Sequence, residues 1–168
     1  EAIAFGGYRP SPAGFLDDTE HWNGTNWTEV NDMNTARSAM GTAGSYTAGI
    51  IAGGESPAGN NTITELWNGT NWTEVNDLST ARRSVAGAGA DSTSALAFGG
   101  ESTDAHAETE TWNGTNWTEV NDMNTARQRV GGFGTNTSAL VFGNNVPSGN
   151  STATELWNGT NWTEVNDL

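Results

Sequence analysis

The sequence predicts an all-β fold assembled from repeated antiparallel sheets. A fifteen-residue string, first written TEHWNGTNWTEVNDM, recurs four times, and its first tryptophans stand 45 residues apart: Trp22, Trp67, Trp112 and Trp157. No segment shows the 3.6-residue hydrophobic period of a helix. A period in the forties that contains a tryptophan, a glycine pair and short extended segments is typical of sheets repeated around an axis, the β-propeller.

Each repeat reads as four short strands. Residues 84–89 alternate small side chains, and residues 94–98 form an apolar run that ends at Gly99-Gly100. Residues 110–112 and 116–120 flank an Asn113-Gly114 bend. Because Asn-Gly between β-rich segments is a strong hairpin signal, these last two segments are predicted to pair.

The repeat resembles the kelch repeat, and the resemblance covers the whole chain. Glycine doublets close an apolar strand, a tryptophan follows in the fourth strand, and an arginine lies in the connection after it. The residues concerned are Gly6-Gly7, Gly53-Gly54 and Gly99-Gly100; Trp27, Trp72, Trp117 and Trp162; and Arg37, Arg82 and Arg127. The resemblance implies blades of four antiparallel strands with the small-residue strand at the ring axis.

The chain departs from the kelch pattern in three respects. Tryptophan stands at the third-strand positions where kelch repeats usually have tyrosine, and the fourth doublet reads Gly143-Asn144. Kelch rings usually have six or seven blades, whereas this chain accounts for about four. Blade topology therefore follows the resemblance, and blade number is left open.

The repeat units are predicted at about 1–33, 34–78, 79–123 and 124–168, within one propeller domain or propeller segment spanning 1–168. Residues 1–7 read as a second strand, so the first blade lacks its inner strand and the chain holds fifteen strands. An unpaired strand edge would be costly in a closed ring. Three explanations are open: a piece of a longer array, several copies that join into a larger ring, or a four-blade ring with a defective seam. The first two are favoured.

Composition restricts the partners. The chain has twenty acidic residues, six arginines and no lysine, which gives a formal charge of −14. Such a surface repels phosphate backbones, so neither nucleic acid nor membrane insertion is expected. There is no cysteine, no signal peptide and no apolar run of the ~20 residues that span a bilayer.

The tryptophans are expected to be structural. Neighbouring blades crowd near the axis, where small side chains fit, and leave a wedge toward the rim. Each indole can bury on the order of 200 Å², so eight of them are predicted to dominate stability. Asn-x-Thr sequons such as Asn23-Gly24-Thr25 fall in the tight hairpin of every repeat and read as turn chemistry.

Catalytic, metal and cofactor signatures are not found. His21 and His106 occupy different repeat positions and have no partner at metal-ligand spacing. Acids recur in register, but there is no D-x-D-x-D calcium loop. The simpler interpretation is that Asp32 and its counterparts cap a turn, while the glutamates pair with arginines or face solvent. The recurring acids are Glu20, Glu65, Glu110 and Glu155; Glu29, Glu74, Glu119 and Glu164; and Asp32, Asp77, Asp122 and Asp167.

Two sets of residues are candidates for ligand binding. The kelch resemblance places Arg37, Arg82 and Arg127 near the mouth of a central channel, where they would attract anions unless they bond within their own turns. The connections between strands two and three vary freely among repeats, and variable loops on a rigid frame are where binding usually resides. The first of them carries Tyr8, Arg9 and Phe15.

These observations favour a non-enzymatic binding or structural propeller with a protein or glycan ligand on the channel face. The near-identical repeats look like those of phage tail or bacterial surface proteins, which implies an extracellular or virion-surface location. An engineered or reconstructed symmetric scaffold is a second hypothesis, although the divergent loops argue against it. A glycan-acting enzyme that uses channel carboxylates is the third.

Overall fold

The computed structural model describes residues 1–143, 145–146 and 149–168. Nineteen strands and no helix are present among these residues, and every paired strand is antiparallel. The prediction of an all-β fold built from antiparallel sheets is therefore confirmed. Asn144 of the fourth doublet, and Pro147 and Ser148 of the fourth variable connection, lie outside the described residues.

Four main sheets follow one another along the chain. Sheet 1 has three strands and sheets 2, 3 and 4 have four each, always hydrogen-bonded in chain order. Sheet 1 contains β1 (Ala2–Pro10), β2 (Ala13–Trp22) and β3 (Trp27–Glu29); sheet 2 contains β4 (Gly41–Ser45), β5 (Ala48–Ala52), β8 (Thr64–Trp67) and β9 (Trp72–Glu74). Sheet 3 contains β10 (Ala86–Asp91), β11 (Ser94–Phe98), β12 (Thr109–Trp112) and β13 (Trp117–Glu119); sheet 4 contains β14 (Gly131–Thr135), β15 (Ser138–Phe142), β18 (Thr154–Trp157) and β19 (Trp162–Val165).

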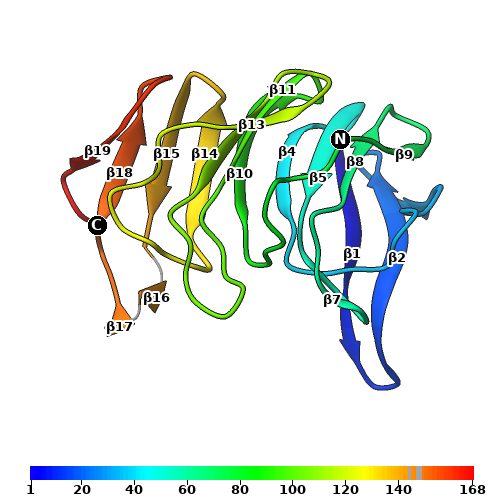
Figure 1. The fold of residues 1–168 in the computed structure, drawn as a ribbon. Coiled ribbons are helices and arrows are strands. Elements are labelled where there is room, and N and C mark those ends of the chain that lie inside the picture. Colours follow the sequence, from blue (N-terminus) through cyan, green and yellow to red (C-terminus); the bar gives the residue numbers. More distant parts are fainter. Residues whose placement is uncertain (144, 147–148) are drawn as a thin grey trace.

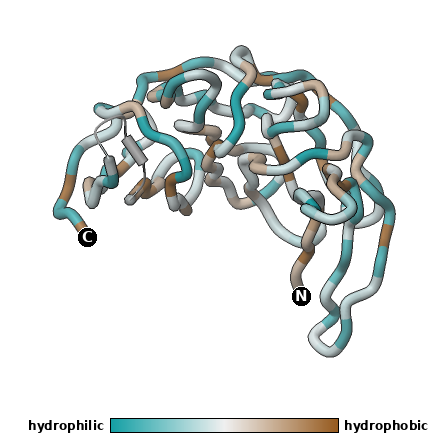
Figure 2. The backbone as a smooth tube through the Cα atoms, turned by 90° about the horizontal axis from the view of Figure 1, so that it is seen from below, coloured by the Kyte–Doolittle hydropathy of each residue, from teal (hydrophilic) through white to brown (hydrophobic). Residues whose placement is uncertain are grey.

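The sheets stand side by side and form an open arch (Figures 1 and 2). Strand β10 contacts both β4 and β14, so the first strands of sheets 2, 3 and 4 are neighbours in space. Strands β4 and β10 are built from glycine, alanine and other small residues, as the sequence predicts. A Cβ at Gly87 would lie 2.5 Å from the carbonyl oxygen of Thr42, which shows why the close approach of two strands requires glycine there.

The connections between the second and third strands take different forms. In sheet 1 the expected polar loop is instead a long β-hairpin, because β1 and β2 stay paired as far as Pro10 and Ala13. Sheet 2 carries a short hairpin of β6 (Glu55–Ser56) and β7 (Gly59–Asn60), and sheet 4 carries one of β16 (Asn145–Val146) and β17 (Gly149–Asn150). Figure 1 shows the β1–β2 hairpin and the β7 and β17 segments projecting from the same edge of the arch.

The Asn-Gly hairpin of each repeat follows from its own sequence. Asn23 Oδ1 accepts hydrogen bonds from the backbone amides of Thr25 (2.9 Å) and Asn26 (3.0 Å), and Gly24 has a φ of 100°. Trp22 and Trp27 are thereby placed directly opposite each other, with ring centroids 5.5 Å apart. The same arrangement recurs in the other three repeats, so the sequons act as turn residues.

Neighbouring sheets are joined by aromatic packing and by three repeated polar contacts. Trp72 of sheet 2 packs edge-on against Phe5 of sheet 1 at 5.0 Å and donates its indole N–H to Thr19 Oγ1 at 3.0 Å. The pairs Trp117–Thr64 and Trp162–Thr109 repeat the indole bond at 3.0 and 2.9 Å. The core is therefore a series of layers between sheets, as expected of wedge-filling tryptophans.

Asp32 and its counterparts do not cap their own turn as predicted. Asp32 Oδ1 accepts the backbone amide of Thr19 at 3.1 Å, and Asp77 and Asp122 accept those of Thr64 and Thr109. Each aspartate therefore secures the end of the fourth strand to the third strand of the same sheet. Glu29, Glu74 and Glu119 are exposed, in agreement with the solvent-facing interpretation.

The glycine doublets are required by backbone conformation and close packing. Gly53 and Gly54 have φ values of 67° and 103°, and the Gly54 amide donates to the carbonyl oxygen of Arg82 at 2.9 Å. A Cβ at Gly53 would lie 2.7 Å from that same oxygen. The doublet therefore brings the connecting segment of the next repeat against the end of β5.

Gly53→Ala is expected to lower the free energy of unfolding by about 2 kcal/mol or more, because alanine is strained at this φ and its methyl group meets the Arg82 carbonyl. Urea denaturation followed by circular dichroism would measure the loss. Gly14→Ala is the matched control, since a Cβ there has no neighbour within 4 Å. Equal stabilities of the two variants would contradict this account.

Candidate binding surface

Arg37, Arg82 and Arg127 do not lie on an accessible surface. All three side chains are among the most deeply buried in the protein, at 0–1% exposure. Each pairs with a buried glutamate of the following sheet: Arg37 with Glu65, Arg82 with Glu110 and Arg127 with Glu155. Burial lowers the pKa of the Arg82 guanidinium, while the charges of Glu110 and Glu108 oppose that change.

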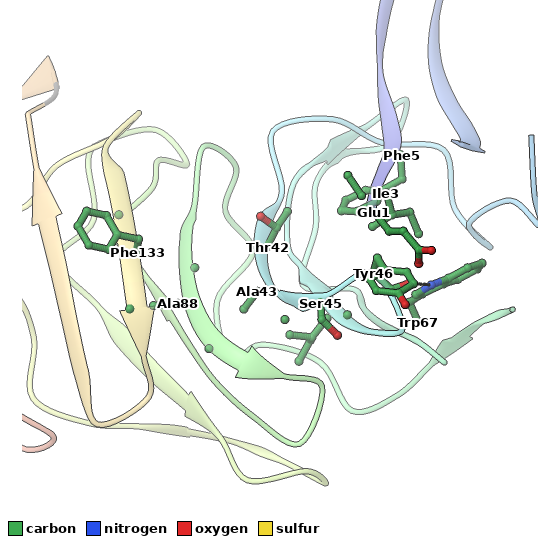
Figure 3. A pocket seen from close by; sticks show the side chains of 18 of the residues that line it. Glu1, Ile3, Phe5, Thr42, Ala43, Ser45, Tyr46, Trp67, Ala88 and Phe133 are labelled. Carbon is green, nitrogen blue, oxygen red and sulfur yellow. Dashed lines mark hydrogen bonds between the residues drawn. The ribbon is translucent and has the colours of Figure 1, made fainter. Parts of the chain in front are cut away.

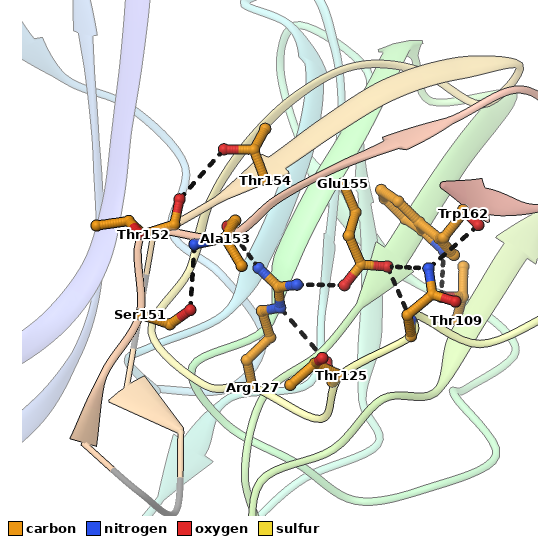
Figure 4. A network of polar contacts seen from close by, with 10 residues as sticks. Thr109, Thr125, Arg127, Ser151, Thr152, Ala153, Thr154, Glu155 and Trp162 are labelled. Carbon is orange, nitrogen blue, oxygen red and sulfur yellow. Dashed lines mark hydrogen bonds and ion pairs between the residues drawn. The ribbon is translucent and has the colours of Figure 1, made fainter. Parts of the chain in front are cut away.

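The arginine–glutamate pairs belong to a network that holds the connection between two sheets (Figure 4). Arg127 donates to the backbone oxygen of Ala153 at 2.7 Å, and Glu155 Oε2 accepts the backbone amide and the Nδ2 of Asn124, both at 2.8 Å. Asn124 Nδ2 also donates to the backbone oxygen of Trp162 at 3.2 Å. Ser79 takes the place of this asparagine in the preceding repeat, where its amide donates to Glu110 at 2.9 Å.

This network corrects the expectation that the three arginines bind an anion at a channel mouth. Their side chains are enclosed within the fold, where each donates to a glutamate and to backbone oxygens, while Arg37 Nε and Nη2 and Arg82 Nε are buried without a partner. The alternative expectation, that glutamates in register pair with arginines, holds for Glu65, Glu110 and Glu155. Glu20 lies at the exposed end of the arch and has no arginine counterpart among the described ion pairs.

Tyr8, Arg9 and Phe15 all lie on the β1–β2 hairpin, away from the arginines. Tyr8 is 54% exposed and stands directly opposite Phe15, with ring centroids 5.3 Å apart. Arg9 is paired in register with Gly14 and donates from Nε to the backbone oxygen of Pro12 at 3.1 Å. Of the six predicted ligand residues, the structure thus brings Tyr8 and Phe15 together and leaves the others apart.

A charged cluster lies where the variable connections of sheets 2 and 3 meet. Arg83 Nη1 lies 2.7 Å from Glu55 Oε2, and its Nε lies 3.3 Å from Glu101 Oε1. Arg129 reaches the same Glu101 oxygen at 3.5 Å. A hydrogen bond with Glu55 is the main cause of a raised Arg83 pKa. Since each charge has an opposite partner, this cluster reads as a surface ion-pair network.

The histidines have structural surroundings. His106 lies between Ser102 Oγ and Glu108 Oε2, at 2.8 Å from each. Burial raises the pKa of the Glu108 carboxyl, but its own backbone hydrogen bond and His106 outweigh burial, so the net pKa is lowered. His21 stacks on Tyr46 with ring centroids 5.7 Å apart.

Among the described residues, one group of carboxylates lies close enough together to share a metal ion. Asp18, Glu29 and Asp32 place their oxygens within 4.8 Å of one another, and all three are exposed. Oxygen ligands suit hard cations such as Ca²⁺. Asp32 already accepts the Thr19 amide, and exposed acidic groups alone do not define a site, so no metal is assigned.

A cavity of about 550 Å³ opens in the hollow of the arch. Figure 3 shows it between β1 on one side and β4, β10 and β14 on the other. Its floor is lined by small residues of these strands, including Ala43, Gly87 and Ala88. Volumes of roughly 300–1,000 Å³ are usual for small-ligand sites.

Two exposed aromatic side chains stand out in this cavity, and Figure 3 shows them on either side of the small-residue floor. Tyr46 follows β4 and is 40% exposed, and Phe133 of β14 is 61% exposed. A hydrogen bond to Glu1 raises the pKa of the Tyr46 hydroxyl above its ordinary value. Thr42 and Ser45 add hydroxyl groups, and Glu1 is the one charged residue of the lining.

Tyr46 and Phe133 are not among the predicted ligand residues, although the sequence carries a signal for them. The repeat positions of Phe133 hold Ala43 and Ala88 in the other copies, and those of Tyr46 hold Asp91 and Asn136. A large aromatic side chain in an otherwise small-residue strand departs from the repeat. Such departures mark positions that packing alone does not explain.

Comparisons with known proteins establish the fold alone. No protein-family model and no curated protein matches the chain. The solved structure of YjhT is similar, with a TM-score of 0.77 at 12% sequence identity, over 90% of this chain and 53% of that chain. The chain thus spans about half the length of YjhT. Among the described residues, no helix is long and apolar enough to cross a membrane.

Proposed function

We propose that this chain is a kelch-like β-propeller segment that acts as a non-enzymatic binding or structural module. The arch of sheets with contacting first strands and the likeness to YjhT support the propeller assignment. The observation that carries the binding function is the 550 Å³ cavity, where Tyr46 and Phe133 are exposed over a rigid floor of small residues. A recognition or adhesion role on a cell or virion surface fits this arrangement.

The cavity chemistry favours a glycan ligand over an anionic one. Aromatic faces can stack on the C–H face of a sugar ring, and the hydroxyls of Thr42, Ser45 and Tyr46 can exchange hydrogen bonds with sugar hydroxyls. The formal charge of −14 disfavours phosphorylated or strongly acidic ligands. A protein ligand that inserts an apolar side chain between the two aromatic residues is the second class.

The glutamates that recur at one repeat position give little support to the hypothesis of a glycan-acting enzyme. Glu65, Glu110 and Glu155 are each bonded to a buried arginine and to the backbone amide of the connection. A general acid or base needs a free position beside the substrate. These glutamates instead stabilise the contact between consecutive repeats.

Glycan-array binding, with calcium and with chelator, tests the proposal. Phe133→Ala and Tyr46→Ala are expected to weaken binding at least tenfold, since each removes an exposed aromatic face from the cavity. Tyr8→Ala is the matched control, because Tyr8 is an exposed aromatic outside the cavity. Loss of binding in Tyr8→Ala alone would move the site to the hairpin. Binding that all three variants retain would overturn the assignment to this cavity.

A further inference from the structure

Three side chains in the connection between β11 and β12 form a hydrogen-bonded series. Ser102 Oγ lies 2.8 Å from His106 Nε2, and His106 Nδ1 lies 2.8 Å from Glu108 Oε2. A serine, a histidine and a carboxylate bonded in this order form the arrangement that activates the nucleophile of many acyl-transfer sites. None of the three residues lines the cavity, so the proposed binding role does not account for them.

The order of these bonds fixes the position of the histidine proton. Burial raises the pKa of the Glu108 carboxyl, but its own backbone hydrogen bond and His106 outweigh burial, so the carboxyl is ionised at neutral pH. An ionised carboxylate only accepts hydrogen bonds, so a neutral His106 carries its proton on Nδ1. The Nε2 atom then accepts the hydroxyl of Ser102, which is the tautomer in which an imidazole can remove a serine proton.

The backbone holds the histidine and the glutamate in place. The His106 amide donates to the carbonyl oxygen of Gly100 at 2.8 Å, and the His106 carbonyl oxygen accepts the amide of Arg127 at 2.9 Å. The carbonyl oxygen of Glu108 accepts Nη1 of the buried Arg82 at 2.8 Å. Both residues are therefore fixed to the frame that joins consecutive sheets, and they need no further ordering when a reactant arrives.

The serine is accessible from solvent. Ser102 is exposed, and the side chains of His106 and Glu108 are 14% and 34% exposed. A small acyl donor in solution can therefore approach the Ser102 oxygen beside a base that is already positioned.

The corresponding connection of sheet 2 makes the same backbone bonds without these side chains. Its equivalent residues, in chain order, are Ser56, Asn61 and Ile63. The amide of Asn61 and the carbonyl oxygen of Ile63 bond to the glycine doublet as their counterparts in sheet 3 do. The backbone of the connection therefore requires neither a histidine nor a glutamate. Two polar replacements that together complete the series are a departure from the repeat of the kind found at functional positions.

We propose that Ser102 is a reactive serine that accepts an acyl group from an activated ester, with His106 as its general base and Glu108 as a positioning residue. The Ser102 oxygen attacks the carbonyl carbon of the ester while its proton passes to His106 Nε2. The bond from that carbon to the leaving oxygen then breaks, and His106 returns the proton to the leaving group. The products are an acyl ester on Ser102 and the released alcohol.

The backbone amide of Ser102 restricts the class of acyl donor. That amide donates to the carbonyl oxygen of Asp104 at 3.1 Å, so it does not stabilise an oxyanion at Ser102. The site is therefore expected to react with donors that have a good leaving group, such as aryl esters, and not with peptide bonds. Hydrolysis of the acyl-serine needs the same stabilisation, so the acyl group is expected to stay attached. The result is a modified binding module, not a chain that turns over substrate.

Mass spectrometry of the 168-residue chain after treatment with p-nitrophenyl acetate tests the proposal. A single acetyl group is expected on Ser102, located by peptide mapping, with release of an equal amount of nitrophenolate. The chain has no lysine and no cysteine, so the α-amino group and the two tyrosines are the main competing sites, and mapping separates them from Ser102. Ser102→Ala is expected to abolish this acetylation. His106→Gln is expected to slow it about a hundredfold, a usual contribution of a general base.

Matched variants separate a reactive site from a merely structural one. Ser56→Ala and His21→Gln should leave the acetylation of Ser102 unchanged, because these residues are the unactivated counterpart serine and the other histidine of the chain. Glu108→Gln is expected to slow acetylation at least tenfold. Nitrogen NMR of the imidazole should show the Nδ1–H tautomer of His106 in the native chain and a mixture of tautomers in Glu108→Gln. Circular dichroism checks that each variant keeps its fold.

Three results would overturn the proposal. The first is acetylation confined to the α-amino group and the tyrosines, and the second is acetylation of Ser102 at the native rate in His106→Gln. The third is continued release of nitrophenolate without an acyl-serine that accumulates. The readout needs no glycan, and Phe133→Ala is expected to leave the acetylation of Ser102 unchanged. Failure of this proposal and failure of the proposed glycan binding are therefore distinguishable.

Discussion

Replacing Arg82 by methionine is expected to lower the free energy of unfolding by about 3–5 kcal/mol, the usual cost of leaving one charge of a buried ion pair without its partner. Arg82 is fully buried and donates to Glu110 at 3.0 Å and to the backbone oxygens of Gly99 and Glu108 at 2.9 and 2.8 Å. The substitution would leave the Glu110 carboxylate uncompensated at 1% exposure. Equilibrium urea denaturation at neutral pH measures the loss.

The chain offers a matched control and a rescue for this experiment. Arg83 is the adjacent arginine, with a third of its side chain exposed and with surface partners, so Arg83→Met is expected to have a small effect. Adding Glu110→Leu to Arg82→Met removes the unpaired charge and is expected to recover part of the lost stability. If Arg82→Met cost no more than Arg83→Met, the buried network would not be the element that secures the connection between sheets.

Trp112→Ala is expected to lower the free energy of unfolding by a similar amount, about 3–5 kcal/mol. The substitution removes a large buried side chain and leaves a cavity that the surrounding residues cannot fill. Trp112 is 1% exposed, packs with Ile50 and Ala95 and donates its indole N–H to the backbone oxygen of Ser92 at 3.0 Å. The measurement is again urea denaturation, followed by circular dichroism because the variant has lost one of the fluorescent tryptophans.

Trp22 is the control for that substitution, since it occupies the same repeat position in sheet 1 and is only partly buried. Trp22→Ala is expected to cost clearly less than Trp112→Ala when both are measured at concentrations where the chain is monomeric. Similar losses for the two variants would mean that the tryptophan stabilises its own hairpin and not the contact between sheets.

Much of the fold could be predicted from local sequence. The strand Ser94–Phe98 has the bounds expected from its apolar run, and the Asn113-Gly114 bend is where β12 and β13 turn. These features depend on hydrogen bonds and side-chain alternation within a few residues, which any copy of the repeat supplies. The long β1–β2 hairpin was missed because Arg9 and Pro10 read as loop residues, whereas pairing with β2 carries the strand through them.

The candidate site was harder to predict. The kelch resemblance places the arginines near a channel mouth, because they lie between the fourth strand of one repeat and the first strand of the next. Their guanidinium groups, however, turn toward glutamates 28 residues away, which only the packing of the connection against the next sheet reveals. Tyr46 and Phe133 come from different repeats, so nothing in either local sequence indicates that they line one cavity.

By itself the sequence determined the repeat, the all-β class, the hairpins and the small residues of the first strands, since each depends on spacing and conformational preference within one 45-residue unit. Tertiary structure alone decided which identical residues are covered. Trp27 and Trp72 stand in the same WNGTNWTEV string, yet one is half exposed and the other is buried. The reason is physical: burial, pairing of charges and the formation of a cavity are properties of the neighbours that surround a side chain, and those neighbours come from the adjacent sheet.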